Sequence, residues 1–306
     1  MNKVIVLLGP TGVGKTAAAI LLAKSLDAEI ISADSMQIYR HMDIGTAKPS
    51  GEEMRMVKHH MIDIVEPSES FSAGSYVDRI VPIIEELHLR GKIPLVAGGT
   101  GLYIRAMTRG IFSGPSADWA LREELLSMEE KDGGSLYRYL QKLDPEAASR
   151  VMRQDIRRIV RALEVCLRSE AGITELQKKL TRPLPYEFIR IGLTRERKEL
   201  YGLIEERVDS MLSRGLLHEV RDLLLLRPGK TALQAIGYKE IVAHLRGEYS
   251  MDEAVRLIKK RTRNYAKRQF TWFRQDSGIL WSDVTGLFTA DKIYKTIALL
   301  LENRLT

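Results

Sequence analysis

Short apolar runs alternate with amphipathic stretches over the first 112 residues of the chain. Runs at 4–8, 29–32, 61–65 and 94–97 have the length and composition of buried strands. Between them, residues 16–26 and 73–90 carry apolar positions at helical spacing. This alternation predicts an α/β fold, in which a parallel sheet has helices on both faces.

A turn-rich stretch, Ser113-Gly114-Pro115-Ser116, ends this alternation. The pattern from about 117 to 185 is helical, and the run at 188–193 is typical of a strand that returns to the sheet. We therefore expect an α/β core at 1–112, an inserted all-helical domain at 113–187, and a third part at 188–306. Beyond residue 196 this third part is expected to be helical and basic.

Residues 9–16 follow the first expected strand and match the phosphate-binding pattern G-x-x-x-x-G-K-[ST] in full. In such a loop the glycines let several backbone N–H groups point at one anion, at the start of the next helix. The Lys15 ammonium adds positive charge near the terminal phosphates, and the Thr16 hydroxyl is suited to hold Mg²⁺. The motif does not say whose phosphates are bound. The candidate phosphate-binding residues are Gly9, Pro10, Thr11, Gly12, Val13, Gly14, Lys15 and Thr16.

Two further polar segments follow expected strands. Asp34 comes after the second strand, where it either caps a turn or presents a carboxylate to the phosphate site as general base or Mg²⁺ partner. Thr100 lies among three glycines, in a loop that either approaches a ligand closely or forms a simple turn. Asp43 and Lys48 are ambiguous in the same way. Because ligands gather at the carboxyl ends of parallel strands, the phosphate loop, Asp34 and Thr100 are expected to line one crevice.

The distribution of positive charge is more informative than its total. The formal net charge of +7 is compatible with an anionic partner but is weak evidence alone. Five arginines fall between residues 150 and 161, and residues 256–274 hold eight Lys or Arg and no Asp or Glu. A solvated helix face usually mixes both signs, whereas a phosphate backbone favours an acid-free stretch. We therefore prefer a nucleic-acid interface to a solvated face.

Other features exclude classes of site. The single cysteine, Cys166, rules out a disulfide framework and cysteine-ligated zinc, and suits a reducing cytosol. His59 and His60 have no further His or Cys nearby, so a metal site there is discounted. The methionines between 36 and 61 form either an apolar surface for a hydrocarbon group or packing filler. No apolar run approaches the roughly 18 residues of a membrane span, and no signal peptide is expected.

Several motifs, taken together, resemble those of one family. They are the phosphate loop, SADSMQIY at 32–39, MDIGTAKP at 42–49, AGGTGLY at 97–103, DIRRIVRALE at 155–164, QAIGYKE at 234–240, TRNYAKRQ at 262–269 and TWFR at 271–274. They resemble the bacterial tRNA dimethylallyltransferases, also called tRNA isopentenyl transferases, and follow that family's order. Eukaryotic members carry a C-terminal zinc finger, which a chain with one cysteine lacks.

The resemblance implies a reaction. A dimethylallyl group would pass from dimethylallyl diphosphate to N6 of adenosine 37, next to the anticodon, in tRNAs that read codons beginning with U. It also implies a P-loop NTPase-like core, Mg²⁺ as cofactor with Thr16 as its ligand, and a diphosphate leaving group in the phosphate loop. The catalytic residues would be Asp34 as general base, Thr100 and Lys15. We expect a cytoplasmic monomer that binds tRNA and no membrane.

The resemblance further implies a set of tRNA contacts. The helical insertion would close over the anticodon stem-loop, whose target base would be flipped out and read near Gln37. Arginines of the 155–164 motif would grip the anticodon loop, and the basic stretch 256–274 would hold the stem backbone. The expected contact residues are Asp34, Ser35, Met36, Gln37, Thr100, Arg122, Arg157, Arg158, Ile159, Val160, Arg161, Lys267, Arg268 and Gln269.

Three rival functions compete with this one. A P-loop kinase of a nucleotide or small metabolite would use the same nucleotide-binding loop but has no use for an acid-free basic helix. An adenylate isopentenyltransferase would lack the motifs at 234–240 and 262–274. An RNA-binding protein whose phosphate loop only switches its conformation would hydrolyse ATP or GTP and transfer no alkyl group. The role of residues 195–214 is left open.

Overall fold

The computed structural model describes residues 2–112, 114–169 and 171–305. The chain forms two units, which we call the core unit (Met1–Ile104 with Pro185–Thr306) and the helical unit (Arg105–Leu184). The sequence pattern placed the insertion at 113–187. The helical unit begins earlier than that, inside the helix α4 (Gly101–Arg109).

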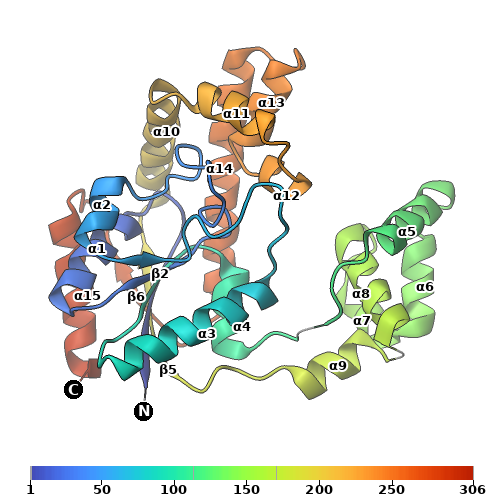
Figure 1. Cartoon of the computed structure of the whole chain (residues 1–306), viewed down its shortest axis with the longest axis horizontal. Coiled ribbons are helices and arrows are strands. Elements are labelled where there is room, and N and C mark those ends of the chain that lie inside the picture. Colours follow the sequence, from blue (N-terminus) through green and yellow to red (C-terminus); the bar gives the residue numbers. More distant parts are fainter. Residues whose placement is uncertain (1, 113, 170, 306) are drawn as a thin grey trace. The chain divides into compact units, whose positions relative to one another are not determined.

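A six-stranded parallel sheet is the frame of the core unit (Figure 1). The strand order is β3-β2-β4-β1-β5-β6, so the first strand of the chain lies in the interior of the sheet. This arrangement confirms the α/β fold that the alternating pattern predicts. The strands are β1 (Lys3–Leu8), β2 (Ile30–Ala33), β3 (His59–His60), β4 (Leu95–Gly98), β5 (Glu187–Thr194) and β6 (Ile279–Asp283).

Helices flank the sheet and extend the core unit beyond its edge. α1, α10 and α15 contribute buried side chains to the main apolar core, together with β1 and β5. None of the helices in the described ranges is both long and apolar enough to cross a membrane. The helices are α1 (Lys15–Ser25), α2 (Gly51–Met56), α3 (Ala73–Leu89), α10 (Arg197–Ser213), α11 (Leu216–Leu225), α12 (Lys230–Leu233), α13 (Tyr238–Leu245), α14 (Met251–Phe273) and α15 (Ala290–Leu305).

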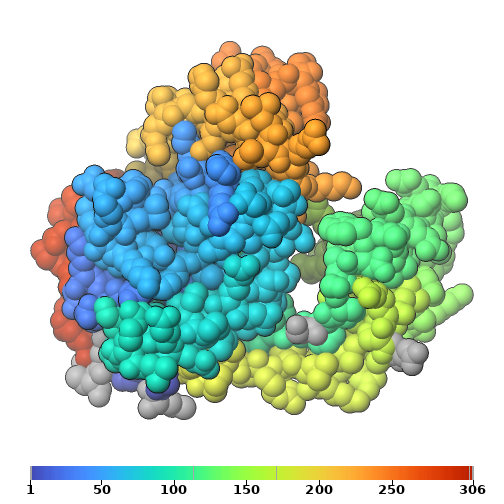
Figure 2. All heavy atoms as spheres, viewed as in Figure 1, coloured from blue at the N-terminus to red at the C-terminus, as the bar shows by residue number. Residues whose placement is uncertain are grey.

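A second apolar core joins the segment after β2 to the helices α10 to α14. Ile38, Tyr39 and Met42 are buried there against side chains such as Val208 and Tyr238. In Figure 2 the blue N-terminal segment lies directly against these orange helices. The segment that follows Asp34 is therefore shaped by residues almost two hundred positions further along the chain.

The helical unit has a small core of its own. Leu136, Leu140, Ile159 and Leu163 are fully buried at its centre. The stretch from 117 to 185 is thus helical, as its pattern predicts. Its helices are α5 (Trp119–Lys131), α6 (Ser135–Leu143), α7 (Pro145–Arg150), α8 (Ile156–Ser169) and α9 (Ile173–Leu180).

Two expectations about strands were wrong. The apolar run 61–65 is no strand: β3 is limited to His59–His60, and Val65 forms only an isolated bridge with Tyr39. Met61 and Asp63 have φ of 64° and 54°, a left-handed backbone that cannot continue a strand. The region beyond 196 was expected to be helical throughout, but Ile279–Asp283 forms the edge strand β6 beside β5.

Candidate active site

Three loops meet at one edge of the sheet because β2, β4 and β1 are neighbours. Their last residues are in register, with Ala33 beside Gly98 and Gly98 beside Leu8. A cavity of about 340 Å³ lies at this edge, a volume typical of small-ligand sites. Its lining includes phosphate-loop residues, Asp34 and Gly99. The expected shared crevice is confirmed for the first two loops, and Gly99 rather than Thr100 lines it from the third.

Left-handed backbone at glycines curls the phosphate loop around the start of α1. φ is 150° at Gly9, 82° at Gly12 and 105° at Gly14, values that residues with a Cβ rarely adopt. A Cβ at Gly9 would also lie 2.7 Å from the carbonyl oxygen of Leu193 on β5. Because α1 begins at Lys15, its unpaired N–H groups and the positive end of its dipole are presented at the loop.

Lys15 folds back over the phosphate loop, and in the described part of the chain it forms no ion pair with a carboxylate. Its Nζ donates to the carbonyl oxygens of Gly9, at 2.9 Å, and Pro10, at 2.8 Å. Burial and the nearby Arg207 lower the pKa of Lys15 to about 7, although Asp34 opposes this shift. The ammonium is therefore short of counter-charge, which an anionic ligand would supply.

Arg207 is a second cation of the cavity, and sequence reasoning missed it. It lies on α10, and its guanidinium donates to the Thr11 hydroxyl at 3.1 Å. Burial lowers its pKa from the ordinary value. The signal was present in the helix periodicity, since Arg207 lies three residues after Ile204 on the buried stripe of α10.

Gln269 ties two of the three loops together. Its Oε1 accepts from the Thr11 N–H at 2.9 Å, and its Nε2 donates to the Gly99 carbonyl oxygen at 2.8 Å. Only 7% of Gln269 is exposed, so this residue, expected to contact tRNA, serves in the structure as a buried bridge. Tyr265, one turn earlier on α14, also lines the cavity, and its burial raises its pKa.

Asp34 caps a turn and at the same time lines the cavity. Its Oδ1 accepts from the backbone N–H groups of Met36, at 2.8 Å, and Gln37, at 3.3 Å, so it caps the turn after β2. It also lines the cavity with Lys15. Thr100 lies behind it, where its hydroxyl accepts from the Ser35 N–H at 3.0 Å. Thr100 therefore holds the Asp34 loop in place.

The side-chain amide of Gln37 is used within the same loop. Its Oε1 accepts from the Ser32 hydroxyl at 3.2 Å, and its Nε2 donates to the carbonyl oxygen of Ala47 at 3.2 Å. Gln37 also lines the cavity. Apolar side chains form another part of the lining, next to the polar Thr46, Glu53 and His59, and they are Ala17, Ala19, Ile30, Ala47, Pro49, Ile62 and Ala97. The cavity thus combines cations with a hydrocarbon wall.

Hard oxygen donors suited to Mg²⁺ are present at the phosphate loop. Thr16 and Ser32 contribute hydroxyls to the lining, and Asp34 contributes a carboxylate. In the described ranges no group of three His, Cys, Asp or Glu residues could hold a metal ion by itself. A metal here would therefore need oxygen atoms from a bound phosphate as well.

The arginines of the helical unit that were expected to contact tRNA fall into two groups. Arg122 and Arg161 donate to the fully buried carboxylate of Glu164, at 2.8 and 2.5 Å. Burial alone would raise the pKa of Glu164, but hydrogen bonds from these arginines and the Asp118 N–H lower it to about 2. Arg157 and Arg158, by contrast, have exposed side chains, and Arg158 pairs at the surface with Asp155 at 3.2 Å.

Two other residues expected to contact tRNA are buried. Ile159 and Val160 are 0% and 6% exposed and pack in the core of the helical unit. The expectation of side-chain RNA contacts at these two positions does not fit this placement, because both lie on the broad buried face of α8. Their role is to hold α8, and hence the exposed Arg157 and Arg158, in place.

Residues 256–274, which cover most of α14, contain no acid, but carboxylates from outside this stretch neutralise several of its cations. Over its first half, four cations pair with carboxylates from other turns or helices: Arg256 with Glu253, Lys259 with Asp209, Arg261 with Glu240 and Arg263 with Glu205. In its second half, Lys267 and Arg268 are exposed and line a shallow hollow with Trp272. Apart from the exposed Lys260, the positive charge of α14 that is not paired with a carboxylate therefore lies near its C-terminal end in the described structure.

Comparisons with known proteins agree on one family. Its sequence profile, described as IPP transferase, matches residues 37–276. The tRNA dimethylallyltransferase of Thermodesulfovibrio yellowstonii is 56% identical over 98% of this chain and 99% of its own. The crystal structure of the full-length tRNA isopentenylpyrophosphate transferase of Bacillus halodurans gives a TM-score of 0.72 at 42% identity, covering 99% of this chain and 98% of that one.

A eukaryotic dimethylallyltransferase, described as acting on tRNA, is also similar in structure. Its TM-score is 0.81 at 30% identity, and the alignment covers 100% of this chain and 79% of that chain. The profile match and the high identity over nearly full length both exceed what a shared phosphate loop alone would give. The chain belongs to the IPP transferase family.

Proposed function

We propose that the protein transfers a dimethylallyl group from dimethylallyl diphosphate to N6 of the adenosine next to the anticodon of tRNA, at position 37. The observation that carries this proposal is the composition of one cavity. Within the described residues, Lys15 and Arg207 supply positive charge without a paired carboxylate, Asp34 supplies a carboxylate, and a part of the wall is apolar. These are the three requirements of a reaction that joins a hydrocarbon to an amine and releases a diphosphate.

The phosphate loop would bind the diphosphate of the donor. Backbone N–H groups at the start of α1, the Lys15 ammonium and the Arg207 guanidinium surround the position where negative charge develops as the C–O bond breaks. Thr16 would hold Mg²⁺ together with diphosphate oxygens. When bound, this ion supplies further stabilisation of charge on the leaving diphosphate.

Asp34 would act as the general base. The adenine N6 lone pair forms a bond to the allylic carbon of the donor, and the C–O bond electrons leave with the diphosphate. The surplus N6 proton passes to Asp34, whose described hydrogen bonds all go to Oδ1, which leaves Oδ2 to accept it. Thr100 would keep the Asp34 loop aligned, and Ser35, Met36 and Gln37 would border the entering base.

The exposed cations would bind the tRNA backbone. On the helical unit these are Arg157 and Arg158, and on α14 they are Lys267 and Arg268. Arg122 and Arg161 would act indirectly, because their guanidinium groups hold Glu164. We propose that the protein works as a monomer in the cytoplasm, where its tRNA substrate is found.

The proposal is tested by direct transfer. The protein is incubated with Mg²⁺, dimethylallyl diphosphate labelled in carbon and unmodified tRNA, and the tRNA is digested to nucleosides. Label is expected in a modified adenosine. Absence of label in tRNA, together with phosphate release from ATP, would instead favour the rival P-loop kinase or switch.

A further inference from the structure

The segment 43–49, which we call the wall segment, forms part of the cavity without regular structure of its own. Thr46, Ala47 and Pro49 line the cavity directly. Ala47 has a φ of 49°, a left-handed backbone that is unfavourable for a residue with a Cβ. Such a conformation persists only where surrounding contacts enforce it. The question is which residues do so.

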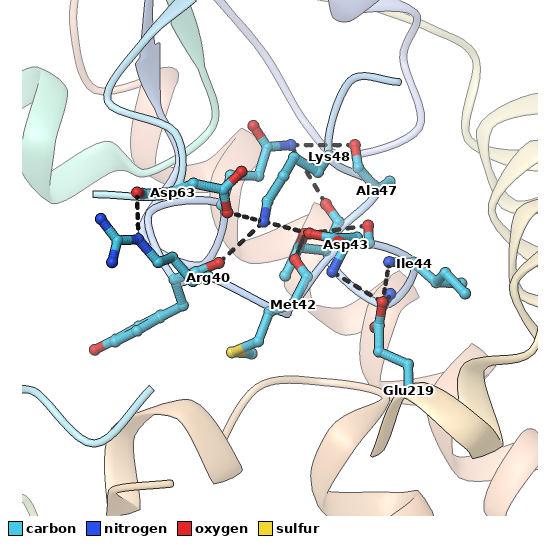
Figure 3. A network of polar contacts seen from close by, with 12 residues as sticks. Arg40, Met42, Asp43, Ile44, Ala47, Lys48, Asp63 and Glu219 are labelled. Atoms are coloured by element: carbon cyan, nitrogen blue, oxygen red, sulfur yellow. Dashed lines mark hydrogen bonds and ion pairs between the residues drawn. The ribbon is translucent and has the colours of Figure 1, made fainter. Parts of the chain in front are cut away.

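Glu219, on α11, holds one end of the wall segment (Figure 3). Its Oε2 accepts from the backbone N–H groups of Asp43, at 2.9 Å, and Ile44, at 2.6 Å. Its Oε1 accepts from the Gly45 N–H at 3.0 Å and from the Tyr238 hydroxyl at 2.6 Å. One carboxylate therefore accepts hydrogen bonds from three consecutive backbone N–H groups of the wall segment. Glu219 is more than 170 residues away in the chain, so the sequence of the wall segment does not reveal this contact.

Lys48 holds the other end. Its side chain is 3% exposed, and its Nζ donates to the Tyr39 carbonyl oxygen at 3.0 Å and to Asp43 and Asp63 at 2.5 Å each (Figure 3). Between the two anchors, Gln37 donates to the Ala47 carbonyl oxygen. The wall segment is thus fixed by polar contacts at both ends, of which the bond from Lys48 to the Tyr39 carbonyl oxygen is buried.

The wall segment also fits closely against the helices beyond it. A Cβ at Gly45 would lie 2.4 Å from the Tyr238 ring and 2.9 Å from Leu216, so no larger residue fits without moving the segment. Tyr238 is fully buried and cannot easily give way. Glu219 and Gly45 therefore hold the wall segment against the same helices, Glu219 through hydrogen bonds and Gly45 through close packing, so a substitution at either position should disturb it.

We infer that Glu219 is a positioning residue that fixes the wall segment and thereby limits the size of the hydrocarbon group that the donor carries. This inference rests on the proposed function, because it assumes an allylic diphosphate in the cavity. A fixed wall of small residues fits a five-carbon group, whereas a wall released from Glu219 would move outward. It would then hold the five-carbon donor loosely and admit a longer one.

The test compares Glu219→Ala, Glu219→Gln and Gly45→Ala with the unaltered protein. A matched control is Asp222→Asn, which removes an exposed carboxylate from the same helix. Steady-state kinetics are measured with tRNA and either dimethylallyl diphosphate or the ten-carbon geranyl diphosphate. Melting temperature is recorded for each variant.

Glu219→Ala and Gly45→Ala are expected to lower kcat/KM for the five-carbon donor by about 10- to 100-fold. The ratio of ten-carbon to five-carbon kcat/KM should rise about tenfold or more, while KM for tRNA stays constant. Glu219→Gln keeps one acceptor oxygen, so its kcat/KM and its donor ratio should lie between those of Glu219→Ala and those of the unaltered protein. An unchanged donor ratio in both variants would overturn the inference, even if the melting temperature falls. If the unaltered protein transfers no five-carbon group at all, the proposed function fails instead.

Discussion

The cations of the phosphate site and those around Glu164 differ in what neutralises them. Within the described chain, Lys15 and Arg207 pair with no carboxylate, and burial lowers the pKa of both. Arg122 and Arg161 share one fully buried carboxylate, which keeps a pKa of about 2. A buried cation without counter-charge is costly unless a ligand supplies it. Lys15 and Arg207 are therefore suited to bind an anionic substrate, whereas Arg122 and Arg161 stabilise the fold of the helical unit.

The largest effect is expected from Lys15→Ala. Removing a charge that stabilises the leaving diphosphate should lower kcat/KM by about 10³-fold. The melting temperature should not fall, since the ammonium is poorly solvated in the folded protein. Lys24→Ala, which removes an exposed cation from the same helix, is the control and should leave both values unchanged. A large loss of stability in Lys15→Ala would mean that this cation supports the fold.

Arg207→Gln tests the second cation of the phosphate site. Because the guanidinium lies beside the phosphate loop, its loss should raise KM for the donor and lower kcat/KM by about 10²-fold. KM for tRNA should stay constant. The control is Arg197→Gln, an exposed position at the start of the same helix. A rise in the tRNA KM alone would place Arg207 in the RNA interface instead.

Glu164→Ala tests the cations that pair with a buried carboxylate in the helical unit. It leaves Arg122, Arg161 and the Asp118 N–H without their shared acceptor, so the helical unit should lose roughly 3 kcal/mol of unfolding free energy. Denaturant unfolding followed by hydrogen exchange in α5 and α8 measures this loss. Diphosphate binding should be unaffected, because its groups lie in the core unit. Glu124→Ala, an exposed change on α5, should cost less than about 0.5 kcal/mol.

The pKa of Lys15 predicts how donor binding depends on pH. At pH values below about 7 the ammonium is charged in the empty site, and above it the charged fraction falls tenfold per pH unit. Binding must then take up a proton, so donor affinity should fall by up to about tenfold between pH 7.5 and 8.5. Lys15→Arg keeps its charge and should lose this part of the pH dependence. An equal pH dependence of donor affinity in the unaltered protein and in Lys15→Arg would mean that Lys15 does not cause it.

The smallest effects concern the surface of α14. Lys267→Ala and Arg268→Ala should each reduce the slope of log affinity for tRNA against log salt by about 0.7 to 0.9. Arg256→Ala removes the same charge from the same helix, but Glu253 already pairs with it, so its slope should hardly change. Equal slopes for all three variants would mean that pairing with carboxylates does not decide which cations bind RNA.

The residues that could be predicted are those whose chemistry is contiguous in the chain. The phosphate loop needs eight successive residues, and Asp34 follows a recognisable strand, so both were found from sequence. The parallel sheet followed from the period of apolar residues for the same reason. Even so, the strand expected at 61–65 was wrong, because a left-handed backbone at Met61 and Asp63 overrides an apolar run.

The residues that could not be predicted act across the fold. Arg207 reaches the phosphate loop only because α10 packs beside it, and Gln269 bridges two loops from α14. The carboxylates that neutralise α14, such as Asp209 and Glu205, come from α10. Counting the charged residues of α14 alone therefore misses these carboxylates. β6 was missed because a five-residue edge strand between helices has little periodicity to read.

The account's central claim is that the donor's diphosphate is held by Lys15 and Arg207 and departs whole while the carbon passes to tRNA. One measurement tests it: a single-turnover reaction with a donor labelled with ¹⁴C in the allyl group and with ³²P in its terminal phosphate. We predict ¹⁴C in a tRNA adenosine and an equal amount of ³²P in intact diphosphate, both abolished in Lys15→Ala. Release of ³²P as orthophosphate, or its appearance on RNA, would contradict the claim.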